Sequence, residues 1–192
     1  MSGRFFSTFA AIVVSVLLAG VVFSMLHTAA DNFALPLSDA NIIRKQAAEK
    51  DLDPALIAAV IYAETKFDPR PSSAGAQGLM QILPTTAYYL AHLSGGIAFT
   101  AGDLADPSVN VAYGSYYLRY LLDHYNGNEM LAVAAYNGGL TNVDAWVAHA
   151  QAAGHQLAVQ EIPFPQTREY VGRVLEAERA YRETYPRQLG LE

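Results

Sequence analysis

The longest apolar stretch of the chain lies at its beginning. Residues 5–30 contain no Asp, Glu, Lys or Arg, and residues 9–25 are mostly Ala, Val, Leu and Ile without a polar stripe. About 20 apolar residues span a bilayer as a helix, so the stretch predicts an N-terminal transmembrane or signal helix over residues 1–30. An uncleaved anchor would keep Arg4 inside, and a cleaved signal peptide would end near residues 28–30. The length favours the anchor, and both versions export the rest of the chain.

Residues 31–37 have the composition of a linker, and apolar residues then recur at helical spacing. This pattern predicts an all-α domain over residues 38–192, with no strand-rich region and no internal repeat. Ser38 or Asp39 is expected to cap the first helix. Asp53 followed by Pro54 is expected to start the second, and Asp106 followed by Pro107 to open the helix at 106–125. The expected helices cover residues 38–50, 53–64, 79–93, 106–125, 129–136 and 142–150, with a last helix after Pro165 that ends near residue 185.

Aromatic residues are concentrated in the expected helix at 106–125. Four tyrosines interleave with its aliphatic residues: Tyr113, Tyr116, Tyr117 and Tyr120. Rings at this spacing usually belong to a core, and we expect them there. Trp146 is the only tryptophan. A lone indole is more often part of a core or rim than a sugar-stacking surface, so we leave it outside the site.

Composition and charge narrow the functional classes. A chain of 192 residues suits one domain, and its net charge of −6 argues against a nucleic-acid partner. The same charge gives no help in binding an anionic cell wall, so local contacts would have to hold such a substrate. The chain has no cysteine and five scattered histidines, which excludes disulfides and a lipoprotein attachment point and gives no metal-ligand spacing. We therefore expect neither a metal nor a cofactor.

Glu64 stands at the end of a strongly apolar helix. Three apolar residues share the helix face from which Glu64 projects: Ile57, Val60 and Ile61. Loss of hydration there would raise the pKa of the carboxyl group, which is what a general acid at neutral pH requires. The simpler alternative is a glutamate at the helix margin, which extends to water or pairs with Lys66 or Arg70. Position alone favours that alternative, because buried carboxylates are rare.

The turn after this helix favours a functional role for Glu64 over a position at the helix margin. Gly75 and Gly78 allow a ligand to approach the backbone closely, while Ser72, Ser73 and Gln81 add neutral hydrogen-bonding groups near the acid. Neutral groups beside a lone acid suit a polyhydroxylated substrate better than a phosphate, which would require Lys or Arg.

These residues resemble the lytic transglycosylases of the soluble, goose-lysozyme-like type, which cleave peptidoglycan. That family has Glu-Ser, a short loop with Ser, and then Gly-Ala-x-Gly-Leu-Met-Gln-x-x-Pro-x-Thr-Ala. Residues 75–87, GAQGLMQILPTTA, fit this pattern throughout. Two departures occur. Thr65 stands where the family has Ser, and the loop is about one residue short, so the loop serine falls on Ser72, with Ser73 as the second choice.

Two further segments resemble the same family in the same order. Residues 135–139, AYNGG, correspond to Ala-Tyr-Asn-x-Gly, whose tyrosine faces the catalytic glutamate in the family. Residues 161–171, EIPFPQTREYV, correspond to Pro-x-x-Glu-Thr-x-x-Tyr-Val, with Gln166 in place of the glutamate and Tyr170 retained. Taken alone, the first segment would be an ordinary helix end, and the second would be a C-terminal helix that closes the core. Together the three segments extend the resemblance over residues 38–185.

The resemblance implies a lysozyme-like, mainly helical bundle around a glycan cleft. It implies cleavage of the β-1,4 bond between N-acetylmuramic acid and N-acetylglucosamine, with formation of 1,6-anhydromuramic ends. Glu64 would be the one catalytic residue, acting first as acid and then as base. The substrate-binding residues would be Ser72, Ser73, Gln81, Tyr136 and Asn137.

Three alternatives remain open at this point. The domain could be a hydrolytic muramidase of the lysozyme type, a non-catalytic peptidoglycan-binding or scaffold protein, or a membrane-tethered structural domain. The expected partners are peptidoglycan strands, the membrane through the N-terminal helix, and other cell-envelope proteins. The expected location is the cell envelope, on the outer side of the membrane, or secreted if the N-terminal segment is cleaved.

Overall fold

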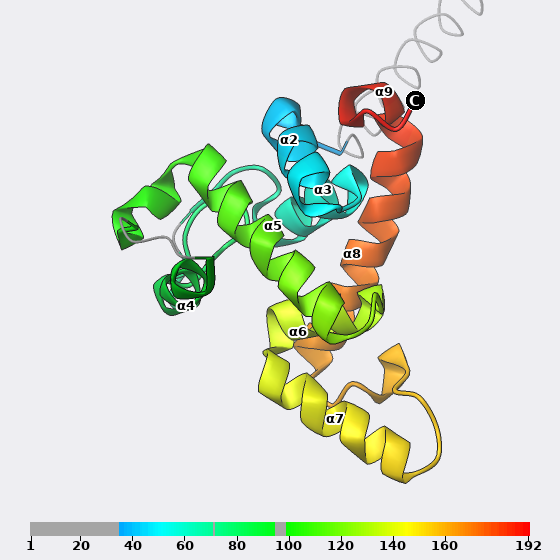
Figure 1. The fold of residues 1–192 in the computed structure, drawn as a ribbon. Helices are drawn as coiled ribbons and strands as arrows, with labels where there is room; N and C mark the ends of the chain where they lie inside the picture. The colour runs from blue at the N-terminus through cyan, green and yellow to red at the C-terminus, as the bar shows by residue number, and fades with distance from the viewer. Residues whose placement is uncertain (1–34, 71, 95–98) are drawn as a thin grey trace, which may run out of the picture. The chain divides into compact units, whose positions relative to one another are not determined.

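Helix α3, Pro54–Thr65, is buried on all sides over residues 55–61. In the computed structural model, residues 35–70, 72–94 and 99–192 are described, and residues 36–192 form one compact unit (Figure 1). The expected N-terminal membrane helix and most of the expected linker lie outside the described residues. Of the helices in the described ranges, none is both long enough and apolar enough to cross a membrane.

The described part of the chain is helical, as the sequence predicts. The helices are α2 Ala40–Lys50, α3, α4 Pro84–Ser94, α5 Pro107–His124, α6 Glu129–Gly138, α7 Leu140–Ala152, α8 Pro165–Thr184 and α9 Pro186–Leu189. Two short 3-10 helices, η1 Ala101–Ala105 and η2 Val159–Glu161, lie in the connections. Each predicted helix therefore exists, most with bounds within two or three residues of the prediction.

Helix starts follow the predicted chemistry in two places and depart from it in a third. The Asp53 carboxylate accepts a hydrogen bond from the Ala55 amide (2.7 Å) at the start of α3, and Asp106 caps α5 in the same way. At α2 the predicted side-chain cap is wrong. Asp39 adopts a left-handed conformation and makes no cap bond, because its carboxylate accepts the Ser38 hydroxyl instead (2.7 Å).

The helix predicted from residue 79 begins five residues later. Gln77 and Ile82 form an isolated β-bridge, in which each amide donates to the other carbonyl (both 3.0 Å). Gln81 within this turn has a φ of 48°, which a helix cannot contain. Pro84, which suits a first helical position, then starts α4. We refer to residues 77–82 as the bridged turn.

The core is built where α3 packs on α8 (Figure 1). The fully buried large side chains here include Leu56, Ile57, Ile61, Tyr170, Val174 and Tyr181. At the start of α3 the guanidinium group of Arg182 joins Asp53 to Glu178, so an ion-paired cluster ties the two helices together. The opposite end of α3, which carries Glu64, therefore has a fixed position relative to α8.

The prediction that the four tyrosines of α5 are core residues is wrong. Tyr113, Tyr116, Tyr117 and Tyr120 are only partly buried, because smaller residues occupy the helix face that enters the core. Those core residues are Val111, Gly114, Leu118 and Leu121. The ring of Tyr117 lies beside that of Tyr136, with centroids 5.3 Å apart. Tyr117 thus lies beside Tyr136, whereas Tyr113 and Tyr116 line a separate hollow with Lys50 and Ser94.

Asn110 holds the bridged turn from behind. Its side chain is fully buried; it accepts a hydrogen bond from the Met80 amide (2.8 Å) and donates to the carbonyls of Gln77 (2.8 Å) and Leu104 (3.1 Å). Gly78 packs so closely that a Cβ atom there would lie 2.0 Å from the Asn110 amide. One carboxamide therefore satisfies three backbone groups and fixes the turn in place.

We expect Asn110→Ala to destabilise the domain by roughly 2–4 kcal/mol, because it takes the partner from the buried Met80 amide and removes two further bonds, to the carbonyls of Gln77 and Leu104. Asn142→Ala is the matched control, since that exposed side chain makes a single bond, to the Gly138 carbonyl (2.7 Å). Denaturant unfolding of both variants measures the difference. Equal losses in the two variants would contradict the role given to Asn110.

Candidate functional site

Glu64 occupies the last turn of α3 and is partly buried. Burial raises the pKa of its carboxyl group to about 7, although the Tyr170 hydroxyl and the positive charge of Arg173 act in the opposite direction. Removal from water is thus the dominant effect. Near neutral pH the carboxyl group exists in both protonation states, as a group that must both give and accept a proton requires.

The Tyr170 hydroxyl is the hydrogen-bonding partner of Glu64. It donates to Oε1 of Glu64 over 2.7 Å, and the tyrosine itself is 2% exposed on the face of α8 that packs on α3. The guanidinium carbon of Arg173, one turn further along, lies 5.9 Å from the centre of the Tyr170 ring. The simpler alternative for Glu64, pairing with a nearby cation, is not observed. Arg70 pairs with Asp68 instead (2.6 Å).

Two further hydroxyl groups attach the bridged turn to the site. The Thr65 hydroxyl donates to the Leu79 carbonyl (2.9 Å) and lies 3.1 Å from the Ile61 carbonyl. The Tyr136 hydroxyl donates to the Met80 carbonyl (2.9 Å). Thr65 therefore supplies a hydroxyl group where the resembling family has a serine, and this departure keeps a link between α3 and the turn.

Both site tyrosines remain neutral donors. The pKa of Tyr136 and the pKa of Tyr170 lie well above the usual value, first because both hydroxyl groups are buried and second because Glu64 is nearby. A phenol that stays protonated can donate to Glu64 or to a backbone carbonyl over the whole pH range in which Glu64 titrates.

The polar residues of the loop before the turn make mostly internal contacts. Ser72 Oγ accepts a hydrogen bond from the Ala76 amide (2.9 Å), and Ser73 is exposed. The Gln81 carboxamide donates to the carbonyls of Arg70 (3.0 Å) and Gly78 (2.9 Å). The structure thus shows Ser72 and Gln81 shaping the loop, and their contacts with a glycan stay predictions.

Asn137 lies at a hollow between the end of α6 and the start of α8. Its Oδ1 accepts a hydrogen bond from the Thr167 hydroxyl (2.8 Å). This hollow, of about 430 Å³, contains no charged side chain; its lining residues are Asn137, Gly138, Phe164, Pro165, Gln166 and Thr167. Gln166 thus faces the hollow at the place where the resembling family has an acid. We call this hollow the α6–α8 hollow.

A raised carboxyl pKa is not unique to Glu64. Burial and a hydrogen bond with Glu178 raise the pKa of Glu129 to about 7 as well. Glu178 in turn pairs with Arg182, in the cluster that ties α3 to α8. Within the described residues, no group of three or more His, Cys, Asp or Glu side chains could hold a metal ion.

The sequence reasoning missed two residues of this site. Tyr170 was matched to the family's tyrosine but given no role at the site, with a core-closing helix as the simpler alternative for its segment, and Asn110 was not considered. A signal for Tyr170 existed in its match to the family's tyrosine in the third segment, three residues after Thr167 and so about one helical turn away. No signal for Asn110 existed, since nothing in the sequence shows which amides a buried side chain will satisfy.

The arrangement can be compared with known proteins. Residues 41–159 match the family described as Transglycosylase SLT domain. The chain belongs to this family. The soluble lytic murein transglycosylase of Escherichia coli (strain K12) is 31% identical over 150 residues, which are 77% of this chain and 23% of that protein. The membrane-bound lytic murein transglycosylase C of Salmonella arizonae is 28% identical over 164 residues, 73% of this chain and 45% of that protein.

Comparison with solved structures supports the assignment to the SLT family and confirms the lysozyme-like, all-helical fold. The 70 kDa soluble lytic transglycosylase from Escherichia coli superposes with a TM-score of 0.72 at 31% identity, over 78% of this chain and 25% of that one. This SLT-family chain therefore corresponds to about a quarter of the length of the soluble relative. The predicted resemblance is confirmed, and the all-helical part of the predicted fold class with it.

We expect Glu64→Gln to stabilise the domain in a pH-dependent way. Because the folded-state pKa of Glu64 is about 7 and the ordinary value is 4.5, the folded wild type loses stability as pH rises through that interval. The variant should match the wild type near pH 4.5 and exceed it by roughly 1–3 kcal/mol above pH 7. Thermal unfolding from pH 4 to 9 measures this, and a constant difference across the range would contradict the raised pKa.

Proposed function

We propose that this chain is a peptidoglycan lytic transglycosylase. It cleaves the β-1,4 bond between N-acetylmuramic acid and N-acetylglucosamine and leaves a 1,6-anhydromuramic end. The observation that carries the proposal is one partly buried glutamate, Glu64, whose pKa is about 7 and whose Oε1 accepts the Tyr170 hydroxyl. Membership of the SLT family and the names of the relatives support the same activity.

A single carboxyl group can perform both proton transfers of this reaction. Since Oε1 accepts the Tyr170 hydroxyl, the proton of the neutral acid resides on Oε2, which gives it to the bridging oxygen as the glycosidic bond breaks. Positive charge develops at the anomeric carbon, where the substrate's own N-acetyl group assists. The Glu64 carboxylate then removes the proton of the muramoyl C6 hydroxyl, whose oxygen closes onto the anomeric carbon. Tyr170 and Arg173 stabilise the carboxylate between the two steps.

The other predicted residues would hold the glycan. Asn137 and the neutral lining of the α6–α8 hollow fit a polyhydroxylated chain. Tyr136 lies against Tyr117 and bonds the bridged turn, so it would shape the cleft beside Glu64. Ser73 is exposed, and Ser72 and Gln81 keep acceptor oxygens, so these three side chains would contact sugar hydroxyl groups from the loop.

The hydrolytic alternative lacks a residue to activate water. Most glycosidases use two carboxyl groups, but the other acids of the three segments, Asp68, Glu161 and Glu169, are all exposed. Asp68 is exposed and paired with Arg70 (2.6 Å), and Glu161 is paired with His155 (2.9 Å). A raised pKa also occurs at Glu129, outside the site, but only Glu64 combines it with a place in the segment that resembles the family's catalytic motif. The single-acid reaction therefore fits this site best.

The domain organisation forms part of the proposal. We assign residues 1–30 to a membrane anchor or cleaved signal peptide, residues 31–37 to a linker and residues 38–192 to the catalytic domain. The apolar run at 5–30 and the membrane-bound relative support an enzyme that works in the cell envelope. Peptidoglycan strands are the proposed substrate, with the membrane and other envelope proteins as partners and cell-wall remodelling as the purpose.

We expect Glu64→Gln to abolish release of muropeptides from purified cell wall while the helical circular dichroism spectrum stays unchanged. Mass spectrometry of the wild-type digest should find anhydro ends, which are lighter than reducing ends by one water. Reducing ends would identify a hydrolase instead. Binding to the wall without any released product would identify a scaffold, and activity of the variant comparable to wild type would reject Glu64.

A pair of tyrosine variants separates the two hydroxyl groups of the site. Tyr170→Phe removes the donor to Glu64, so we expect kcat to fall by about tenfold to a hundredfold. Because that bond lowers the pKa of Glu64, the alkaline limb of the pH–rate profile should move to higher pH. Tyr136→Phe removes a bond to the Met80 carbonyl and should leave that limb in place. Identical profiles for both variants would contradict the assignment.

A further inference from the structure

The chain turns sharply directly after the helix that carries Glu64. Helix α3 ends at Thr65, and the next two residues, Lys66 and Phe67, have φ angles of 51° and 63°. This left-handed region suits glycine, because the Cβ atom of any other residue comes too close to its own backbone. Two consecutive residues with side chains therefore adopt a strained conformation beside Glu64, and other contacts must maintain it. We refer to residues 65–68 as the left-handed turn.

Two backbone hydrogen bonds close the left-handed turn. The Lys66 amide donates to the Tyr62 carbonyl (3.0 Å), and the Asp68 amide donates to the Thr65 carbonyl (2.9 Å). In this conformation the Thr65 hydroxyl also reaches the Leu79 carbonyl (2.9 Å). The left-handed turn therefore sets both where α3 ends and how that end meets the bridged turn.

The ring of Phe67 packs against a tyrosine of α8. Its centroid lies 6.2 Å from that of Tyr181. The ring of Tyr62, which precedes Glu64 on α3, meets the same tyrosine edge to face with centroids 6.1 Å apart. Ring pairs of this kind contribute more than the area that they bury. A single ring of α8 thus holds one residue before Glu64 and one residue after it.

Tyr181 is itself fixed in position. Its side chain is fully buried, and its hydroxyl donates to the Pro36 carbonyl (2.5 Å). Tyr170, which donates to Glu64, lies about three turns earlier on the same helix. Helix α8 therefore contacts the end of α3 at two separate points. Tyr170 holds the carboxyl group, and Tyr181 holds the residues on either side of it.

We propose that Phe67 is a positioning residue for the reaction at Glu64. Its ring, packed on Tyr181, keeps the left-handed turn closed and so keeps the Glu64 carboxyl group at the Tyr170 hydroxyl and away from water. Without that ring, the strain of two left-handed residues favours opening of the turn and fraying of the last turn of α3. The proposal rests on the proposed function, because it gives Phe67 a task in that reaction.

The experiment titrates Glu64 in the full-length chain, by the carboxyl resonance of carbon-13-labelled glutamate that disappears in Glu64→Gln. Burial is the largest effect on the pKa of Glu64, so water that enters an opened turn should lower the midpoint. In Phe67→Ala we expect a decrease of roughly one half to one pH unit. Phe67→Gly accepts a positive φ without strain, so it gives the same comparison if Phe67→Ala does not fold. Phe67→Tyr keeps the ring and should keep the wild-type midpoint.

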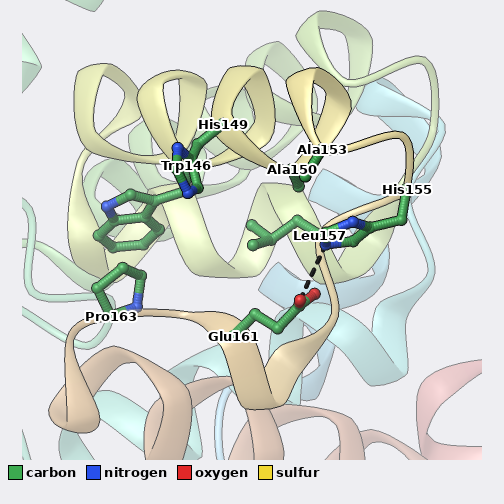
Figure 2. A pocket seen from close by; sticks show the side chains of 8 residues that line it. All are labelled: Trp146, His149, Ala150, Ala153, His155, Leu157, Glu161 and Pro163. Atoms are coloured by element: carbon green, nitrogen blue, oxygen red, sulfur yellow. Dashed lines mark hydrogen bonds and ion pairs between the residues drawn. The ribbon is translucent and has the colours of Figure 1, made fainter.

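An aromatic residue elsewhere in the domain provides the matched control. Figure 2 shows Trp146 of α7 beside Pro163, in the wall of a separate cavity. Like Phe67, Trp146 is partly buried, and it packs against the ring of Phe164 with centroids 4.9 Å apart. Trp146→Ala therefore also removes a partly buried ring contact. It should lower the melting temperature, as Phe67→Ala does, and leave the midpoint of Glu64 unchanged.

Amide hydrogen exchange at Lys66 and Asp68 shows whether the turn opens, because these amides make its two closing bonds. Faster exchange in Phe67→Ala together with a lower midpoint would support the positioning role. Unchanged exchange, faster exchange with an unchanged midpoint, or an equal shift in Trp146→Ala would overturn it. If the wild type releases no anhydro products while the shift in Phe67→Ala is present, the catalytic function alone is refuted.

Discussion

The hydrogen bond from the Tyr170 hydroxyl to Glu64 is the interaction on which the site depends. It joins the end of α3 to the second turn of α8, and it is made in surroundings dry enough that the pKa of Glu64 rises to about 7. Burial without a donor would leave the acid protonated well above neutral pH, and a donor in water would leave it ionised. The two opposing effects together produce an acid that can also serve as a base.

The rest of the fold fixes the two ends of that bond. The cluster around Arg182 joins Asp53, at the start of α3, to α8, so the helix that carries Glu64 is tied to its neighbour at both ends. The bridged turn is held by Asn110 from behind and by Thr65 and Tyr136 from the site. Hydroxyl and carboxamide groups that satisfy backbone atoms thus do most of the positioning, and little of it depends on exposed ion pairs.

The sequence predicted most of the helices and the partly buried position of Glu64, but it did not predict which side chains contact Glu64. Helical spacing and the pairs Asp53-Pro54 and Asp106-Pro107 predicted most helices, because caps and periodicity are local properties. The late start of α4 was missed because the bridge of residues 77–82 is stabilised from outside, by Asn110. The tyrosines of α5 were placed in the core because ring spacing does not show which face a helix buries. Tyr170 is 106 residues from Glu64 in sequence, so only the folded chain brings their side chains together.

A direct titration of Glu64 tests the central claim, that one partly dehydrated acid lies poised near neutrality. With carbon-13-labelled glutamate, the side-chain carboxyl resonance that disappears in Glu64→Gln identifies the residue in nuclear magnetic resonance spectra. The account predicts that this resonance titrates with a midpoint near 7, as burial requires. A midpoint near the ordinary value of 4.5 would contradict it, because Glu64 would then be ionised when the substrate arrives.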